Sequence, residues 1–322
     1  MPRGQRRDIV AALISATVII CTHNRADCLA RALEATIAEV EACQAEALVV
    51  DNASSDDTPR LLAARRANTP RLRVVEESTL GLSVARNRGM AEAAGEVVVF
   101  LDDDAVPRRG WLAALLAPYA EPAVACVGGR IRLHFPEGRP AWLSDAFFPT
   151  LSAYDLGDRP RRIAGEPATH YPYGANISFR RDVAMRLGGF SARMGLAGRA
   201  GLQQEETDLC YRVEGAAGDI RYAPDAVVDH WIFPERLEPA WFLQRFWLHG
   251  RSNAVFELRN RGLRKALGVW RWHYLQRLRD HTPTRARNEH LLAACQRREA
   301  FGYLVGLGTG VLHLRALRRD LS

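Results

Sequence analysis

A run of five apolar residues, 97–101, leads directly into three consecutive carboxylates, Asp102, Asp103 and Asp104. The run is rich in β-branched residues and predicts a buried strand. Three adjacent like charges repel one another, and a bound cation best allows a folded protein to tolerate them. In an open α/β sheet the ligand crevice lies at the carboxyl ends of the strands. The segment therefore predicts an α/β protein with a divalent-metal and nucleotide-diphosphate site at one sheet edge.

Strand-like and helix-like patterns alternate over the first 130 residues. This alternation predicts a mostly parallel sheet with right-handed crossovers, of which one half resembles a Rossmann nucleotide-binding unit. Residues 134–172 are rich in proline, glycine and aromatic residues without a clear period, and predict a long loop or lid that contacts substrate. The strand-like segments are 16–21, 47–50, 72–75, 97–101, 124–133, 174–179 and 226–230, and the helix-like segments are 29–40, 82–94, 111–119 and 205–213.

The positive charge is concentrated near the C-terminus. Residues 251–322 hold 15 Arg and Lys against 5 Asp and Glu, within a chain of net charge +7. Five of the seven tryptophans lie at or near the start of this region: Trp231, Trp241, Trp247, Trp270 and Trp272. Arginine and tryptophan together suit peripheral contact with an anionic membrane. A solvated basic face over a tryptophan-containing core is the alternative.

Composition excludes several classes of protein. The six cysteines are scattered without C-x-x-C spacing, which argues against a zinc module or a disulfide scaffold and favours reduced thiols in the cytoplasm. A Walker sequence with its phosphate-binding lysine is absent. The apolar segment 300–314 is too short to span a bilayer. We therefore expect a cytoplasmic enzyme, with peripheral contact at the inner face of the membrane as a further option.

Three polar clusters follow successive predicted strands: 22–25, 51–58 and 102–104. The carboxyl ends of parallel strands meet at one edge, so these clusters converge. Asp51 is placed to accept hydrogen bonds from a nucleotide base, Asp102 suits ribose hydroxyls or metal, and Asp104 suits direct metal ligation. Oxygen ligands of this kind favour Mg²⁺ or Mn²⁺. Arg86 can add a phosphate-binding charge.

These segments, together with residues 81–89, resemble family 2 glycosyltransferases. The resemblance covers residues 16–235 and implies a GT-A fold and an inverting, metal-dependent enzyme that uses a nucleotide-sugar donor. It implies nucleotide contact by Asp51 and Arg86, and ribose and metal contact by Asp102 and Asp104. Thr22, Asn24, Arg25 and Asp103 complete the predicted donor-binding set. Residues 16–133 are then the nucleotide-sugar half, 134–235 the acceptor and catalytic part, 1–15 an N-terminal extension and 236–322 a basic, mainly helical region.

Two further segments extend the resemblance. Residues 174–180 resemble the acceptor-side strand of the family, which implies that Asn176 contacts the acceptor. Residues 203–212 resemble the E-D-x-D-L-x-x-R signature, with Glu206 where aspartate is usual. An inverting transfer needs a carboxylate that accepts the proton of the acceptor hydroxyl. Glu206 is our prediction for this base, and Glu205 and Asp208 remain alternatives.

His230 closes the predicted strand 226–230 and resembles a histidine that binds the metal or diphosphate in some relatives. Imidazole is an acceptable Mn²⁺ ligand, while a structural histidine at a strand end is the other interpretation.

The predicted function is transfer of a single sugar to an acceptor hydroxyl, in cell-surface polysaccharide, glycolipid or glycosylated-metabolite synthesis. A UDP-sugar is favoured because the family most often uses uracil, and the acceptor is a saccharide, a lipid-linked saccharide or a small molecule. Processive synthases carry Q-x-x-R-W, which the string 244–247 does not match.

Two other functions stay open from the sequence. A sugar-phosphate nucleotidyltransferase fits the crevice, although the loop 22–25 lacks the glycine expected of a triphosphate-binding loop. A non-enzymatic basic binding protein fits the C-terminal charge, but the ordered carboxylates would repel a nucleic acid, so no nucleic-acid partner is expected.

Overall fold

The computed structural model describes residues 14–164, 171–192, 202–279 and 287–312. Nine strands in these residues form one mixed sheet in the order β3-β2-β1-β4-β8-β6-β9-β5, with β7 paired to β9. The strands are β1 (Ala16–Thr22), β2 (Glu46–Asp51), β3 (Leu72–Glu76), β4 (Val97–Asp102), β5 (Ala105–Pro107), β6 (Val124–His134), β7 (Arg161–Ile163), β8 (Asn176–Arg180) and β9 (Asp219–Trp231).

The half of the sheet that contains β1 to β4 is parallel, as the alternating pattern predicted. Beyond β4 the direction changes, because β8 runs antiparallel to both β4 and β6. β6 and β9 are again parallel to each other. The prediction of an α/β fold with a mostly parallel sheet is confirmed.

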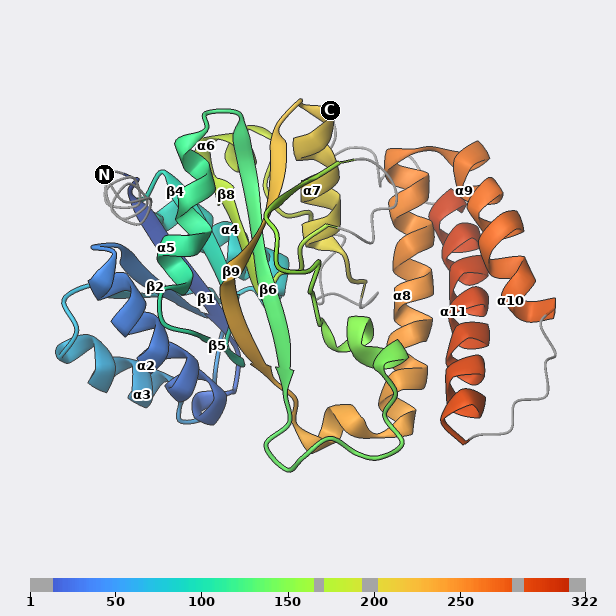
Figure 1. The fold of residues 1–322 in the computed structure, drawn as a ribbon, viewed down its shortest axis with the longest axis horizontal. Helices are drawn as coiled ribbons and strands as arrows, with labels where there is room; N and C mark the ends of the chain where they lie inside the picture. The colour runs from blue at the N-terminus through green and yellow to red at the C-terminus, as the bar shows by residue number, and fades with distance from the viewer. Residues whose placement is uncertain (1–13, 165–170, 193–201, 280–286, 313–322) are drawn as a thin grey trace.

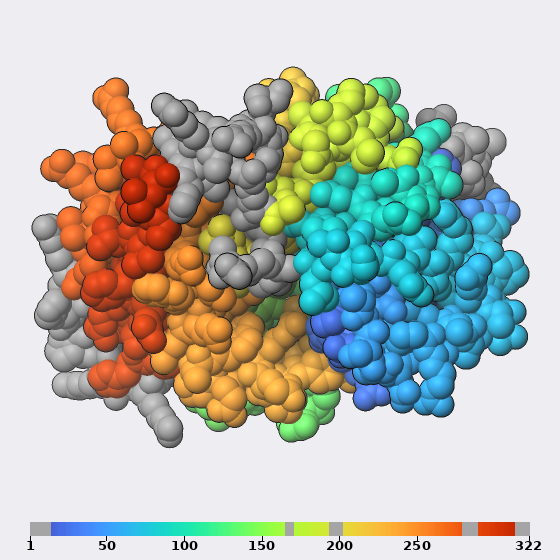
Figure 2. Space-filling model, turned by 180° about the vertical axis from the view of Figure 1, so that it is seen from behind, coloured from blue at the N-terminus to red at the C-terminus, as the bar shows by residue number. Residues whose placement is uncertain are grey.

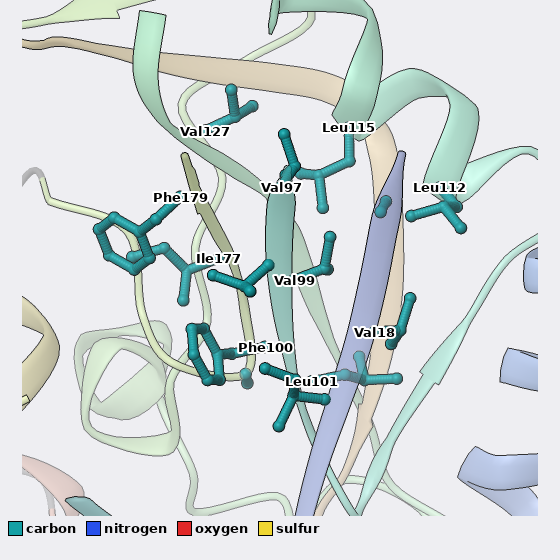
Figure 3. Packing of buried hydrophobic residues seen from close by; sticks show 14 of the residues in the cluster. Val18, Val97, Val99, Phe100, Leu101, Leu112, Leu115, Val127, Ile177 and Phe179 are labelled. Atoms are coloured by element: carbon teal, nitrogen blue, oxygen red, sulfur yellow. The ribbon is translucent and has the colours of Figure 1, made fainter. Parts of the chain in front are cut away.

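Helices cover both faces of this sheet. α2 (Ala26–Ala42), α3 (Thr58–Ala67) and α5 (Trp111–Leu116) pack together, while α4 (Leu82–Glu92), α6 (Arg181–Arg186) and α7 (Glu205–Gly215) form a second group. The central strand β4 is therefore buried on both sides, which explains its uninterrupted apolar sequence. Figure 3 shows its side chains between these layers, with Phe100 on the side of Phe179.

In the described residues after β9, a short 3₁₀-helix (Pro234–Leu237) is followed by four α-helices and a π-helical turn at Trp270–Tyr274. The α-helices are α8 (Pro239–Asn260), α9 (Leu263–Val269), α10 (Leu275–Arg279) and α11 (Arg287–Leu312). They lie side by side at one end of the sheet (Figure 1). Glycines allow α8 and α11 to pack closely. A Cβ on Gly250 would lie 2.0 Å from the carbonyl oxygen of Glu299, and one on Gly302 would lie 2.2 Å from that of Trp247.

The segment expected as a lid is more structured than its sequence indicated. Between 134 and 164 it contains a 3₁₀-helix, Asp145–Leu151, and strand β7. Leu143, Phe147 and Leu151 are at most 1% exposed and pack with Phe242 of α8. Its aromatic residues therefore fill a core between the sheet and the C-terminal helices. Residues 165–170 of this segment, and residues 1–13 of the expected N-terminal extension, lie outside the described residues.

No helix among the described residues has both the length and the apolar character needed to cross a bilayer.

Candidate active site

The three polar clusters meet at one edge of the sheet, as the strand order requires. In the parallel register Thr22 pairs with Asp51, and Cys21 pairs with Asp102. The loop after β1 also contacts the loop after β2 directly, because Asn24 Oδ1 accepts a hydrogen bond from the backbone N–H of Ser55 at 2.7 Å. Asn24 adopts a positive φ of 53°, so this loop is held in a conformation uncommon for a non-glycine residue. Asn24 therefore joins the two loops.

Asp51 is 5% exposed at the end of β2, and one of its oxygens accepts from the backbone N–H of Ser54 at 3.0 Å. The bond shapes the polar loop that was predicted to hold the nucleotide base.

Asp104 is buried among three cationic or imidazole groups. Its Oδ1 lies 3.0 Å from His230 Nε2, and its Oδ2 lies 2.9 Å from Arg236 and 2.8 Å from Arg25. Burial by itself raises the pKa of Asp104, but His230, Arg236 and Arg25 together hold it well below its ordinary range. Asp104 is therefore an ionised carboxylate, as a metal ligand must be.

The position of His230 provides a test of whether a cation fits. Its Nδ1 lies 3.0 Å from the carbonyl oxygen of Leu151, which can only accept a hydrogen bond. Nδ1 therefore carries a proton, and Nε2 faces the carboxylate oxygen of Asp104 at 3.0 Å, with Arg236 3.4 Å away. The short contact between Nε2 and Asp104 needs positive charge beside it, which a second ring proton, Arg236 or a bound cation can supply. His230 thus has the orientation of a metal ligand whose other nitrogen is fixed by the protein.

Asp102, Asp104 and His230 can each direct one ligand atom to a common point, since these atoms all lie within 4.8 Å of one another. Two carboxylates and one imidazole suit Mn²⁺ or Mg²⁺ and leave coordination positions for phosphate oxygens. The donor set therefore fits the predicted metal. Arg25 and Arg236 now neutralise Asp104, so a cation would share this carboxylate with them.

Asp103 faces away from this group toward the loop after β1. It accepts a hydrogen bond from Thr22 Oγ1 at 2.8 Å and pairs with Arg25 at 3.1 Å. Burial raises the pKa of Asp103 to about 7, with Arg25 opposing the shift and Asp104 adding to it. Thr22, Arg25 and Asp103 therefore form a network next to Asp104, in which Thr22 and Asp103 are buried and Arg25 is partly exposed.

Arg86 is buried and joins the two sides of the site. It pairs with Glu205 of α7 at 2.7 Å and with Asp102 at 3.2 Å. A Cβ on Gly174 would lie 2.2 Å from its guanidinium, so a larger residue there would force the guanidinium to move. Burial, and then the neighbouring Glu206, raise the pKa of Glu205 to about 8, while Arg86 opposes the shift. Arg86 holds two carboxylates in this structure, and its contact with a donor phosphate stays a prediction.

The three candidate bases lie in different surroundings. Glu206 is only partly buried, and its Oε2 is buried without a hydrogen-bond partner. Glu205 is occupied by Arg86. Asp208 is completely buried, pairs with Arg212 at 2.8 Å and with Arg259 at 3.2 Å, and accepts from Asn260. Asp208 is therefore a structural residue and cannot reach an acceptor, so this alternative was wrong.

The surroundings of Asn176 do not fit the predicted contact with the acceptor. It is 0% exposed, accepts a hydrogen bond from Trp111 Nε1, and donates to the carbonyl oxygens of Arg130 and Ala226. These bonds use the whole amide to join α5, β6, β8 and β9. The prediction that Asn176 contacts the acceptor was wrong, because a side chain with no free polar atom and no exposure cannot touch a ligand.

The sequence did not point to two arginines that lie near the site. Arg236 follows β9 and reaches Asp104. Arg245, on α8, makes no ion pair with a described carboxylate, and its guanidinium lies 5.8 Å from the centroid of the Trp241 ring. Burial, and then Arg236, lower the pKa of Arg245, while Glu206, Glu205 and Asp102 oppose the shift. Both lie before the basic run at 251–322, and no sequence pattern singled them out.

α8 also supports the N-terminus of α7, where Glu205 and Glu206 begin the helix. Gln203 donates its backbone N–H to Ser252 at 2.9 Å, and Gln204 donates its side-chain amide to Asn253. Gln204 has a positive φ of 83°, a strained conformation that these contacts maintain. In Figure 2 the surface is hollowed between the cyan residues of the sheet half and the light-orange residues of α8.

Residues 17–188 match the model of the family described as Glycosyl transferase family 2, which is more than half of the chain. The chain belongs to glycosyltransferase family 2. It is a glycosyltransferase enzyme, so the nucleotidyltransferase and non-enzymatic alternatives do not hold.

Similar proteins agree with this family assignment. The glucosyl-dolichyl phosphate glucuronosyltransferase of Haloferax volcanii is 28% identical over 243 residues, which cover 71% of this chain and 75% of that protein. The succinoglycan biosynthesis protein ExoM of Rhizobium meliloti is 27% identical over 256 residues, or 78% of each chain. A mannosyltransferase from Pyrobaculum calidifontis, solved with GDP-Man and Mn²⁺, superposes with a TM-score of 0.53 at 23% identity, covering 94% of this chain and 74% of that one. This likeness confirms the GT-A fold.

Proposed function

We propose that this glycosyltransferase moves a single sugar from a nucleotide diphosphate donor to an acceptor hydroxyl with inversion at the anomeric carbon. The observation that carries the proposal is the buried oxygen of Glu206 that has no hydrogen-bond partner, next in the chain to Glu205, which Arg86 links to Asp102 of the carboxylate and histidine group. A carboxylate with a free oxygen is available to take a proton, and the acidic group opposite is suited to a cation and a diphosphate.

In the proposed reaction the acceptor oxygen attacks the anomeric carbon as the bond from that carbon to the diphosphate oxygen breaks. Glu206 accepts the proton of the acceptor hydroxyl. Arg86 keeps Glu205 engaged at 2.7 Å, so that Glu206 is the carboxylate left free. Glu205 remains the alternative base, since it is adjacent on the same helix turn.

We propose Asp102, Asp104 and His230 as the residues that hold Mn²⁺ or Mg²⁺, which when bound neutralises the charge of the leaving diphosphate. Arg236 and Arg245 provide further positive charge on the side of the C-terminal helices. Arg25, Thr22, Asn24 and Asp103 shape the loops beneath the nucleotide, and Asp51 is proposed to contact the base. The division into a donor half, 16–133, an acceptor and catalytic part, 134–235, and a helical region, 236–322, remains part of this proposal.

The proposed donor is a UDP-sugar, as the family resemblance implies. The neighbour from Pyrobaculum calidifontis was solved with GDP-Man, so GDP-sugars are the first competitor. A saccharide or lipid-linked saccharide is the proposed acceptor, because one relative is named for a dolichyl phosphate substrate and another for succinoglycan biosynthesis. We propose the cytoplasm as the compartment, since all six cysteines are free thiols.

A thermal-shift panel tests the donor site. UDP-, GDP- and TDP-sugars are each added with Mn²⁺, with Mg²⁺ and with a chelator, to the full chain and to Asp104→Asn. A true donor raises the melting temperature by mass action, and the rise should need both the cation and Asp104. An equal rise with the chelator would contradict the metal assignment. The anomeric configuration of the product, read by NMR, then tests inversion.

A further inference from the structure

Exposed apolar side chains gather on one face of α11. Large apolar residues at the spacing i, i+3, i+4 and i+11 lie on the same side of a helix. The opposite side, with Gly302 and Gly306, packs against α8. We call the exposed side the α11 apolar face, and its residues are Phe301, Leu304, Val305 and Leu312, with exposed fractions of 52%, 46%, 41% and 81%.

A groove lies beside this face, between α8 and α11. It has a volume of about 270 Å³ and is lined by Ala240, Leu243, Gln244, Trp247 and Arg298. Arg298 is three residues before Phe301, so the groove adjoins the α11 apolar face. The Arg298 guanidinium lies 5.9 Å from the centroid of the Trp247 ring. Figure 2 shows α11, in red, at the surface beside the orange residues of α8.

The helices from α9 to α11 carry more exposed basic than acidic side chains. Within the described residues of 263–312 the exposed basic side chains are Arg264, Lys265, Arg271, Arg297 and Arg298. The same residues include two carboxylates, of which only Glu289 is exposed. Glu299 is 5% exposed and binds His249 at 2.8 Å and also Arg277. The basic side chains therefore exceed the available carboxylates.

The tryptophans of this region contribute less exposed apolar surface than the sequence suggested. Trp270 stacks on Tyr303, Trp241 packs edge-on against Phe242, and Trp231 packs against His134. Trp272 is 69% exposed. Four of the five tryptophans are partly buried, and the exposed apolar area lies on α11.

We propose that the α11 apolar face and its groove form a peripheral docking surface for an anionic lipid bilayer. Its apolar side chains would enter the boundary between headgroups and acyl chains, and Arg297 and Arg298 would meet lipid phosphates. A second copy of the chain fits less well, because a two-fold contact on this face would bring the arginines of both copies together. The surface uses no residue of the active site.

Vesicle co-sedimentation of the full chain tests the surface. Binding is compared for phosphatidylcholine vesicles and for vesicles that also contain about 30% phosphatidylglycerol, at low and high salt. The wild type should bind the anionic vesicles, and Phe301→Gln/Leu304→Gln should reduce binding by about tenfold or more. Arg297→Gln/Arg298→Gln should reduce binding to anionic vesicles only. Leu80→Gln/Met185→Gln, which alters residues 56% and 44% exposed elsewhere, is the control and should bind as the wild type does.

Wild-type protein that stays in the supernatant with anionic vesicles would overturn the proposal. So would equal binding by Phe301→Gln/Leu304→Gln and the wild type. Light scattering on the same samples identifies the competing occupant: a dimer that Phe301→Gln/Leu304→Gln abolishes, without vesicle binding, means that a second copy covers the face. Donor binding in the thermal-shift panel should be unchanged in all these variants, so a failure here is separate from a failure of the proposed function.

Discussion

The two sides of the active site differ in charge and in how the chain builds them. The proposed donor half, residues 16–133, supplies carboxylates at or just after the ends of parallel strands, chiefly Asp51, Asp102 and Asp104. The other side supplies His230 from the end of β9, Arg236 from the 3₁₀-helix Pro234–Leu237 and Arg245 from α8. The donor half is ordered by the hydrogen bonds of the sheet, whereas the cationic side depends on packing of helices distant in sequence. The comparison teaches that a strand-end motif predicts one side of such a site and leaves its charge partners unspecified.

The largest effect should come from Glu206, the proposed base. Glu206→Gln keeps the shape of the side chain but removes the proton acceptor. We expect kcat to fall by about 1,000- to 10,000-fold while donor affinity is kept. Steady-state kinetics and the donor thermal shift measure the two quantities. If Glu206→Gln turns over normally and Glu205→Gln does not, the base is Glu205.

The second-largest effect is expected from Asp104, in the proposed donor half. Asp104→Asn removes the charge that pairs with His230, Arg236 and Arg25. We expect roughly a 100- to 1,000-fold loss of kcat/KM and no response to added Mn²⁺, because a bound cation contributes several kcal/mol of charge stabilisation. A Mn²⁺ titration followed by tryptophan fluorescence reads binding without turnover. Asp57→Asn, on an exposed side chain, is the control and should leave Mn²⁺ affinity unchanged.

A smaller effect tests the cationic side. Arg245→Gln removes a positive charge from α8 that interacts electrostatically with Glu206 and Asp102. We expect kcat/KM to fall by about tenfold to a hundredfold, because a positioned cation stabilises the leaving diphosphate. Arg264→Gln, on exposed α9, should have no effect. Normal kinetics in Arg245→Gln would mean that the C-terminal helices support α7 without taking part in the reaction.

The smallest effect concerns stability and pH. The pKa of Glu205 is about 8 in the folded protein against an ordinary value of 4.5. The folded state therefore holds this proton more tightly than the unfolded state, and stability is lost as pH rises through that interval. Between about pH 5 and about pH 9 we expect the melting temperature of the wild type to fall more than that of Glu205→Gln, by a few degrees. Parallel melting curves for the two proteins would contradict this.

Residues at the ends of predicted strands were located well from the sequence. Thr22, Asp51, Asp102 and Asp104 converge because strand order and the parallel register determine where strands end. Asn176 and Asp208 were misjudged because polar residues within a strand and a helix give no sign of which face they occupy. Asn176 proved to bind Trp111, and Asp208 proved to bind Arg212 and Arg259. The identity of a polar residue therefore does not show whether it contacts a ligand or binds another buried side chain.

The sequence by itself determined the family, the α/β class and the acidic edge, since these follow from local apolar periods and from motifs short enough to read along the chain. Only the tertiary structure decided which carboxylate stays free, how His230 is oriented, and that Arg236 and Arg245 approach the site. Those features depend on side chains far apart in sequence, among them Arg86 with Glu205 and Gln203 with Ser252. Packing places such pairs together, and no local periodicity encodes which distant partner fills a buried position.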